Sequence, residues 1–264
     1  MRHRRIYQFL IIYFLPFFRR IFQFLIIYFL GLALLLSAKY LFGLSDYVIP
    51  SPTDLTRTLT NVFSRYFSDV TDTLSVAVIG QIVSIFLAML VGILGRQTTW
   101  FGSFIKVAAY NVQAYPIVAI APIIFILFGD GFMSRLLIAA MICYFPILLS
   151  VIGIMSEPIG DIEHFYRMTG RMRWQLEVKI RAFENLSKLT TVIAGSATLA
   201  MAGTIVAEFI AANAGIGYSI KTALYQSDLS KILIALFLIG ITLSVYQGVL
   251  ELTGTLIKKG WANF

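Results

Sequence analysis

Six mostly apolar segments, each long enough to form a membrane-spanning helix of about 20 residues, run through this chain of 264 residues. Only helices and closed barrels satisfy all their backbone hydrogen bonds inside a bilayer. The segments cover about 21–43, 74–95, 105–128, 133–156, 189–213 and 231–257. The sequence therefore predicts an all-α polytopic membrane protein with six transmembrane helices.

Composition supports the membrane assignment and argues against other classes of protein. Hydrophobic residues make up 59% of the chain, against roughly 45–50% apolar residues in soluble domains, and the mean hydropathy is +0.85. The net charge of +8 comes from cations beside apolar segments, where they orient membrane proteins, so nucleic-acid binding is not indicated. Cys143 is the single cysteine, which excludes an intrachain disulfide. His3 and His164 share no ligand cluster, so we predict no metal site.

The chain opens with a near-perfect tandem repeat. The stretch RRIYQFLIIYFL at 4–15 returns as RRIFQFLIIYFL at 19–30, and the two copies differ only in Tyr7 against Phe22. A short duplication is the preferred origin of this repeat. The alternative is a pair of helices that each have a function.

The length of the repeat region limits how it can cross the membrane. One helix over 6–42 would be about 55 Å long at about 1.5 Å per residue, against a hydrocarbon core of about 30 Å. It would also place Arg19 and Arg20 in lipid, where charge is costly. We therefore predict a transmembrane domain over 21–264, and an N-terminal extension over 1–20 that forms an interfacial helix.

Lysine and arginine predict the orientation in the membrane. Basic residues cluster in 1–20, in 157–188 and at 258–259, whereas the loop 44–73 carries four Asp against two Arg. Cytoplasmic loops hold an excess of Lys and Arg. With six spans, we predict that both termini are cytoplasmic.

The basic loop between spans 4 and 5 is unusual for a connection. It reads EPIGDIEHFYRMTGRMRWQLEVKIRAFENLSK over 157–188, with acids and bases interleaved and aromatic residues spread throughout. This pattern predicts two short amphipathic helices broken near Gly170. The loop is either a cap on its own spans or a docking surface for a soluble partner, with aromatic anchors and a charged rim.

Four stretches resemble the permease subunits of bacterial ABC importers. They are VIPSPTDLTRTL at 48–59, AYPIVAIAPIIFILFGDG at 114–131, RMTGRMRWQLEVKI at 167–180 and GTIVAEFIAANAGIGYSI at 203–220. The resemblance covers roughly 45–260 and is closest to the binding-protein-dependent type I family. Within that family it is similar to the branch that serves sulfonates, taurine, nitrate, bicarbonate and some vitamin precursors.

The resemblance implies a fold, a function and a set of partners. The implied fold is that of a type I ABC importer permease with a cytoplasmic coupling helix between spans 4 and 5. The implied function is to form the translocation pathway for a small solute, delivered by an extracytoplasmic binding protein and coupled to separate ABC ATPase subunits. A second permease copy, as a homodimer rather than a heterodimer, and membrane lipid complete the partners. The implied location is the bacterial inner membrane.

The resemblance also places the contact with the ATPase. The residues that correspond to the family's docking loop are Glu163, His164, Phe165, Tyr166, Arg167, Met168 and Gly170. The match is imperfect, because His164, Phe165 and Tyr166 stand where the family has Glu-Ala-Ala, and Phe183 stands where it has proline. This departure is compatible with a specialised ATPase partner. The chain lacks the phosphate-cradling pattern G-x-x-x-x-G-K-[ST], so we expect no cofactor on it, and ATP with Mg²⁺ on the partner.

Polar residues inside the spans are candidates for the translocation path. Glu208 is the only acid deep in a predicted span, and an intramembrane acid is a functional hypothesis by default. It either lines the path or acts as a hinge, or it makes a structural hydrogen bond to a neighbouring helix. The other candidates for the path are Asn111, Gln113, Pro116 and Asn213.

Prolines and glycines predict local features of the same spans. Pro116 and Pro122 are expected to bend span 3, because neither can donate the backbone hydrogen bond of a helix. Gly203, Gly215 and Gly217 are expected to allow helices to approach closely.

Two other classes of function compete with the importer hypothesis. A self-sufficient secondary transporter or channel predicts internal repeats around broken helices and ionisable residues at mid-membrane, and a membrane scaffold predicts neither. The sequence offers only the N-terminal repeat and one acid for the first of these. It does not identify the transported solute.

Overall fold

The structure is a computed structural model that describes the backbone of residues 2–95, 99–156 and 174–262, and the side chains of 18–95, 100–156 and 178–258. All regular structure within these ranges is helical. The helices are α1 (Arg2–Phe42), α2 (Pro52–Gly95), α3 (Thr99–Ala114), α4 (Ile117–Phe128), α5 (Phe132–Ser156), α7 (Trp174–Glu184), α8 (Leu186–Ile210), α9 (Ile216–Tyr225) and α10 (Leu229–Ala262).

Five helices are long and apolar enough to cross a membrane, and the count rises to six if α3 and α4 form one broken span. The all-α membrane fold is therefore confirmed, while the exact number of crossings stays a prediction. The axes of α3 and α4 meet at an angle of 90°. Pro116 lies at this break, as its missing N–H predicts, whereas α4 continues through Pro122.

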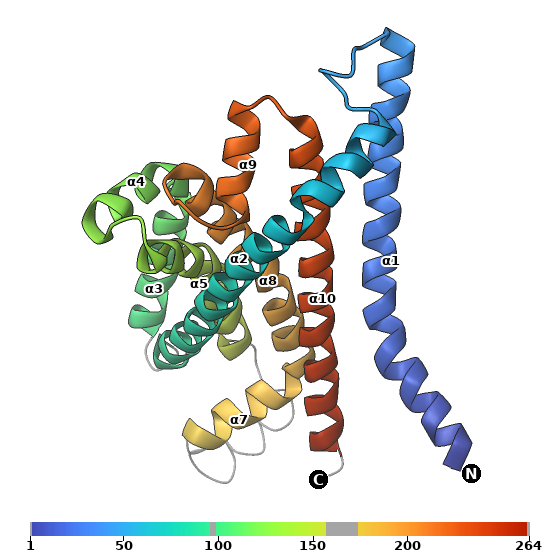
Figure 1. The fold of residues 1–264 in the computed structure, drawn as a ribbon. Helices are drawn as coiled ribbons and strands as arrows, with labels where there is room; N and C mark the ends of the chain where they lie inside the picture. Colours follow the sequence, from blue (N-terminus) through green and yellow to red (C-terminus); the bar gives the residue numbers. More distant parts are fainter. Residues whose placement is uncertain (1, 96–98, 157–173, 263–264) are drawn as a thin grey trace.

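The helices form a bundle around α2, α5 and α8, which pack against one another. Helix α10 packs on α2, α8 and α9, and α1 packs along α10. In Figure 1 both chain ends lie at the same end of the bundle as α7, and the turns at 43–51 and 226–228 lie at the other end, here called the distal end. Such an arrangement fits an even number of crossings, and the side of the membrane that each end faces stays a prediction.

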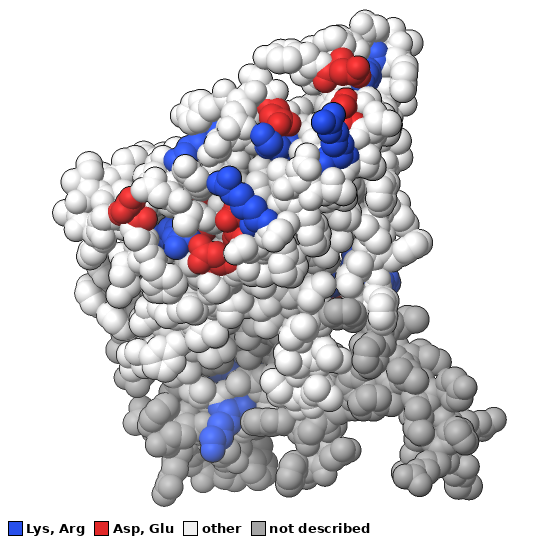
Figure 2. Space-filling view, in the orientation of Figure 1, with Lys and Arg blue, Asp and Glu red and all other residues white. Residues whose placement is uncertain are grey.

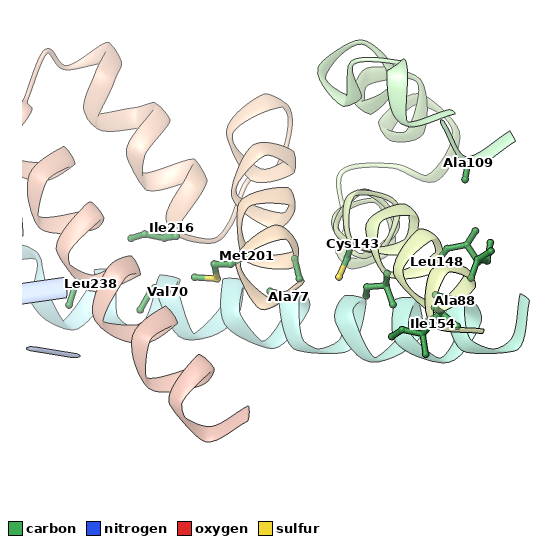
Figure 3. Packing of buried hydrophobic residues seen from close by; sticks show 14 of the residues in the cluster. Val70, Ala77, Ala88, Ala109, Cys143, Leu148, Ile154, Met201, Ile216 and Leu238 are labelled. Atoms are coloured by element: carbon green, nitrogen blue, oxygen red, sulfur yellow. The ribbon is translucent and has the colours of Figure 1, made fainter. Parts of the chain in front are cut away.

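Small residues bring the three central helices together. A Cβ atom built on Gly80 of α2 would lie 3.1 Å from Ala139 Cβ of α5, and one built on Gly203 of α8 would lie 3.1 Å from Ala139 Cα. Ala139 is thus held between two glycines, as in the small-residue interfaces of membrane helices. The predicted role of Gly203 in close packing is confirmed. Figure 3 shows the adjoining core, where Ala77, Cys143 and Met201 lie between α2, α5 and α8.

A buried amide joins α2 to α8 and α10 within the bundle. Gln81 is 1% exposed, and its Nε2 donates hydrogen bonds to the Ile193 carbonyl at 2.7 Å and to Ser196 Oγ at 2.9 Å. The Tyr246 hydroxyl donates to Gln81 Oε1. All polar atoms of this amide side chain are therefore engaged, as burial in an apolar bundle requires.

The N-terminal region differs from the prediction in its continuity. Helix α1 runs without interruption through both repeat copies, whereas a separate helix over 1–20 was predicted. A proline removes one hydrogen bond and can kink a helix without ending it, so Pro16 does not separate the copies. Among the residues whose side chains are described, the apolar span of α1 covers Phe18–Phe42, and the residue at which the span begins stays a prediction. The interfacial position of the first copy stays a prediction.

The second copy is fixed to α10 by three contacts. Arg20 forms a bidentate ion pair with Glu251 and also donates to Gln247 Oε1. The Phe24 ring lies against the Cα of Gly240, where a Cβ would come within 2.0 Å of the ring. The Tyr28 hydroxyl donates to the Leu233 carbonyl at 3.0 Å. These contacts set the register between α1 and α10.

The sequence predicted a loop over 44–73, and this prediction was wrong for most of the segment, because it is helical from Pro52. Helix α2 begins at Pro52 and continues into the span. Its first half is amphipathic, because Tyr66 and Val70 are buried while Arg57 and Arg65 are exposed. A helix that packs one apolar face on the bundle needs no uniformly apolar sequence.

Candidate functional site

The candidate site is built around Glu208, the third residue from the end of α8. Its side chain is completely buried. Helix α8 ends at Ile210, and α9 runs from there toward the distal end (Figure 1). Glu208 therefore lies where the chain turns inside the protein, between α8 and α9.

The Glu208 carboxylate accepts hydrogen bonds from two neighbouring segments. Thr73 Oγ1 of α2 lies 2.8 Å from Glu208 Oε2 and 3.0 Å from Oε1. The Gly217 backbone N–H donates to Oε2 at 3.0 Å. Thr73 in turn accepts a hydrogen bond from the Ile216 N–H at 2.9 Å. The carboxylate thus connects α2 to the start of α9.

Arg135, in the first turn of α5, supplies the balancing charge. Its Nη1 atom lies 3.2 Å from Glu208 Oε1 and 2.7 Å from Asp72 Oδ2. Arg135 is 8% exposed, and its Nε has no hydrogen-bond partner among the described residues. We call Asp72, Thr73, Arg135 and Glu208 the Glu208 cluster.

Two glycines leave room for the carboxylate. Gly215 has a φ of +91°, and a Cβ built on it would lie 2.1 Å from Glu208 Oε1. A Cβ on Gly217 would lie 2.5 Å from the Ile205 carbonyl oxygen. The close approach expected at both glycines is confirmed. Only glycine meets both the conformational and the steric demand at 215.

The geometry of the Glu208 cluster suits a structural clamp better than a lining of the path. Removing one partner of a buried ion pair costs about 3–5 kcal/mol, because the remaining charge stays buried. Three transmembrane helices and the start of α9 meet at this one carboxylate. A completely buried carboxylate cannot contact a passing solute in this conformation.

Other charged residues gather around the distal end. Figure 2 shows acidic and basic side chains on the distal part of the visible face, above a band of uncharged surface. Among them, Asp69 of α2 accepts a hydrogen bond from Ser219 Oγ of α9 at 2.5 Å and lies 3.8 Å from Arg65 Nε. Helix α9 is therefore tied to α2 at a second point beyond Thr73.

The structure separates the five residues predicted to line the path. Glu208 is buried, whereas Asn111, Gln113, Pro116 and Asn213 are exposed on the single chain. Asn111 and Gln113 lie on α3, and the Asn213 amide donates to Asp130 in the turn before α5. The role of all five in transport stays a prediction.

The predicted ATPase-coupling segment lies outside the described residues. This applies to Glu163, His164, Phe165, Tyr166, Arg167, Met168 and Gly170. Helix α7 lies at the expected end of the bundle (Figure 1) and corresponds to the second of the two predicted amphipathic helices. Arg181 of α7 donates to the Met155 carbonyl of α5 at 2.8 Å, so α7 is joined to a membrane span.

Sequence reasoning missed three members of the Glu208 cluster. Asp72 and Thr73 were placed at the end of a loop, and Arg135 was not considered. Arg135 did carry a signal, because a cation four residues into an apolar span needs a partner. Pairing the one intramembrane acid with this cation would have suggested the Glu208–Arg135 pair, but not Asp72 or Thr73.

Comparison with known proteins decides the family. The sequence profile of the family described as "Binding-protein-dependent transport system inner membrane component" matches residues 84–252. The chain belongs to this family. It is therefore a permease component of ABC transport systems, and its apolar helices make it a multi-pass inner-membrane protein.

Two curated relatives are named for the solutes that they transport. The riboflavin transport system permease protein RibX of Chloroflexus aurantiacus is 40% identical over 143 residues, which cover 53% of either chain. The formylaminopyrimidine transport permease protein ThiX of Halalkalibacterium halodurans is 25% identical over 200 residues, which cover 74% of this chain and 78% of ThiX. The matched part of the chain thus spans about half the length of RibX and 78% of the length of ThiX.

Proposed function

We propose that this permease forms the translocation pathway of an ATP-driven importer for a small solute. An extracytoplasmic binding protein delivers the solute, and separate ABC ATPase subunits bind and hydrolyse ATP with Mg²⁺. The observation that carries this proposal is the family match over 84–252, which includes α5, α8 and two of the four residues of the Glu208 cluster, Arg135 and Glu208. This chain is the transport subunit and not the enzyme.

The substrate class that we propose is a nitrogen-containing ring compound related to vitamins. RibX, whose name assigns it to riboflavin, is 40% identical over its matched part, and ThiX is assigned to formylaminopyrimidine. These two solutes are the first candidates to assay.

A second permease copy is the proposed partner within the membrane. Helix α4 exposes Ile126, Leu127 and Phe128, and α3 exposes Trp100 and Phe104. An apolar surface of this kind is typical of an interaction site or of contact with lipid. A homodimer places two copies of the α3–α4 break beside one pathway.

The Glu208 cluster is proposed to transmit movement within each copy. Because Glu208 joins α8 to α2, α5 and the start of α9, these elements shift together when ATP binding moves the bundle. Loss of the clamp would then reduce transport without preventing membrane insertion.

The proposed contact with the ATPase is the segment over 163–170. Its aromatic residues Phe165 and Tyr166 are the anchors, and Gly170 permits the turn that follows. Truncating a central interface anchor costs about 2 kcal/mol or more, which is a factor of about 30 in affinity.

The experiment that tests this proposal is co-purification with the candidate ATPase, followed by measurement of ATP hydrolysis in liposomes with the binding protein. We expect the wild-type complex to hydrolyse ATP faster when the binding protein carries its solute. The Phe165→Ala/Tyr166→Ala variant should release the ATPase or lose this stimulation, and Gly170→Val should do the same. Full retention of the ATPase and full stimulation in both variants would exclude this segment as the coupling site.

A further inference from the structure

An apolar groove lies between α1, α2 and α10, away from the Glu208 cluster. It has a volume of about 250 Å³. Its walls are formed by Tyr28, Phe29, Leu32, Pro52, Leu55, Thr56, Leu59, Ile234 and Phe237. All three helices are candidate membrane spans, so the groove opens within or at the edge of the bilayer.

Aromatic rings of α1 and α10 form part of the groove wall. The Tyr28 and Phe237 ring centroids are 5.0 Å apart, and those of Phe29 and Phe237 are 6.5 Å apart. These three rings pack in the space between α1 and α10. Leu32 of α1 and Leu55 and Leu59 of α2 form the rest of the apolar wall, together with Pro52 and Ile234.

The groove offers almost nothing to a polar ligand. Its two side-chain hydroxyls are already engaged, because Tyr28 donates to the Leu233 carbonyl and Thr56 donates to the Thr53 carbonyl at 2.9 Å. Apolar cavities of roughly 150 Å³ stay dry and take up small hydrocarbons. Water is therefore a poor occupant, and hydrocarbon is a suitable one.

The groove is continuous with the lipid-facing surface. Phe29, in its wall, is 54% exposed, and the neighbouring Leu30 and Leu34 are exposed on the same helix. Beyond the apolar wall there are charges of both signs: Asp54 and Arg57 are exposed on the first turns of α2, and the buried Lys39 pairs with Asp46. Cations and anions together complement a zwitterionic headgroup at the level where the apolar wall ends.

We propose that this groove binds one acyl chain of a zwitterionic phospholipid, with the headgroup at the exposed Asp54 and Arg57. The lipid fills the gap between α1 and α2 and so supports a helix that packs chiefly on α10. This inference is independent of the transported solute and of the ATPase.

The test uses the full-length permease in liposomes that contain phosphatidylethanolamine with a photoactivatable diazirine on its acyl chain. After illumination, adducts are mapped to residues by mass spectrometry. We expect Leu32, Leu55 and Leu59 to carry several-fold more adducts than Ile27 and Leu30, which face bulk lipid on the same α1 helix. Unlabelled phosphatidylethanolamine should displace the groove adducts in proportion to its amount.

Two separate substitutions are designed to fill the groove. If one variant does not fold, the other still tests the proposal. Leu59→Trp and Thr56→Phe should each reduce groove adducts to the level at Ile27, while the matched control Leu30→Trp should leave them unchanged. Adducts no more frequent in the groove than at Ile27, or unaffected by both substitutions, would overturn the proposal. Displacement by riboflavin instead of lipid, or cross-links from the groove to a second copy of the chain, would overturn it as well.

Discussion

At the scale of single residues, two kinds of interaction stabilise the Glu208 cluster: a hydrogen bond from a hydroxyl and a buried ion pair. A hydrogen bond to a charged group contributes about 1.5–3 kcal/mol, whereas breaking a buried ion pair from one side costs about 3–5 kcal/mol. Thr73 belongs to the first kind, and Arg135 and Glu208 belong to the second. The charged pair, not the hydroxyl, is therefore expected to dominate the stability of the cluster.

Substitutions in the Glu208 cluster test this ranking. Glu208→Ala and Arg135→Met should each lower the stability in detergent by about 3–5 kcal/mol and impair transport more than membrane insertion. Thr73→Val should cost less, about 1.5–3 kcal/mol, because its hydroxyl donates to a carboxylate. Chemical unfolding and solute uptake measure the two effects, and the double variant Glu208→Leu/Arg135→Met should recover part of the stability. Normal transport by stable Glu208→Ala protein would show that the acid has no role in transport.

Gly215 allows a sharp steric test at the same carboxylate. Gly215→Ala should displace Glu208, because the new Cβ would lie 2.1 Å from Oε1 at a φ of +91°. The matched control is Gly131→Ala, where a Cβ meets nothing within 4 Å and φ is not positive. Thermal unfolding should show a lower midpoint for Gly215→Ala alone. Equal midpoints for both variants would mean that the carboxylate moves aside freely.

At the scale of helices, the two repeat copies carry the same docking residues, but only the second copy docks on α10. Arg5, Phe9 and Tyr13 correspond to Arg20, Phe24 and Tyr28. Docking the first copy on α10 instead would move Arg19 and Arg20 into the distal half of the span, where charge is costly. The cost of placing Arg19 and Arg20 inside the span therefore decides which copy docks.

Removal of residues 2–16 tests whether the first copy is needed. The shortened chain keeps Arg19 and Arg20 as the positive anchor and keeps every contact of the second copy with α10, so it should insert and transport. In the full chain, Arg20→Ala should loosen α1 from α10, whereas Arg19→Ala, at an exposed position, should not. A cross-link between cysteines at positions 24 and 240 reports this contact. Loss of membrane insertion on removing 2–16 would give the first copy a structural role.

How much was predictable differs from helix to helix. The spans over 133–156, 189–213 and 231–257 were located within a few residues, because long apolar runs have few alternatives in a membrane. The first half of α2 was missed, because its polar face resembles a loop until the packing of Tyr66 and Val70 is known. Glu208 was found as an isolated acid, but its partners Thr73 and Arg135 lie 135 and 73 residues away in sequence, and only the fold brings them together.

At the scale of the whole molecule, the position of both termini at one end of the bundle is the main geometric constraint. The basic residues in 157–188 and at the chain ends predict that this end is cytoplasmic. In this predicted orientation, we expect the distal end, with the Asp69–Ser219 contact and the charges in Figure 2, to face the proposed binding protein.

Cysteine labelling tests this orientation. In a Cys143→Ala background, Thr60→Cys on exposed α2 should react with an impermeant thiol reagent added outside cells, and Arg171→Cys should react only after the membrane is opened. The reverse pattern would contradict the predicted topology.

Uptake into proteoliposomes is the measurement that tests the central claim most directly. The permease, its candidate ATPase and the loaded binding protein are reconstituted with ATP on the ATPase side, and labelled riboflavin and formylaminopyrimidine are followed in parallel. We predict uptake of at least one solute that requires ATP, the ATPase and the binding protein together. Uptake by the permease alone, driven by an ion gradient and unchanged without the ATPase, would contradict the importer function and support a self-sufficient transporter.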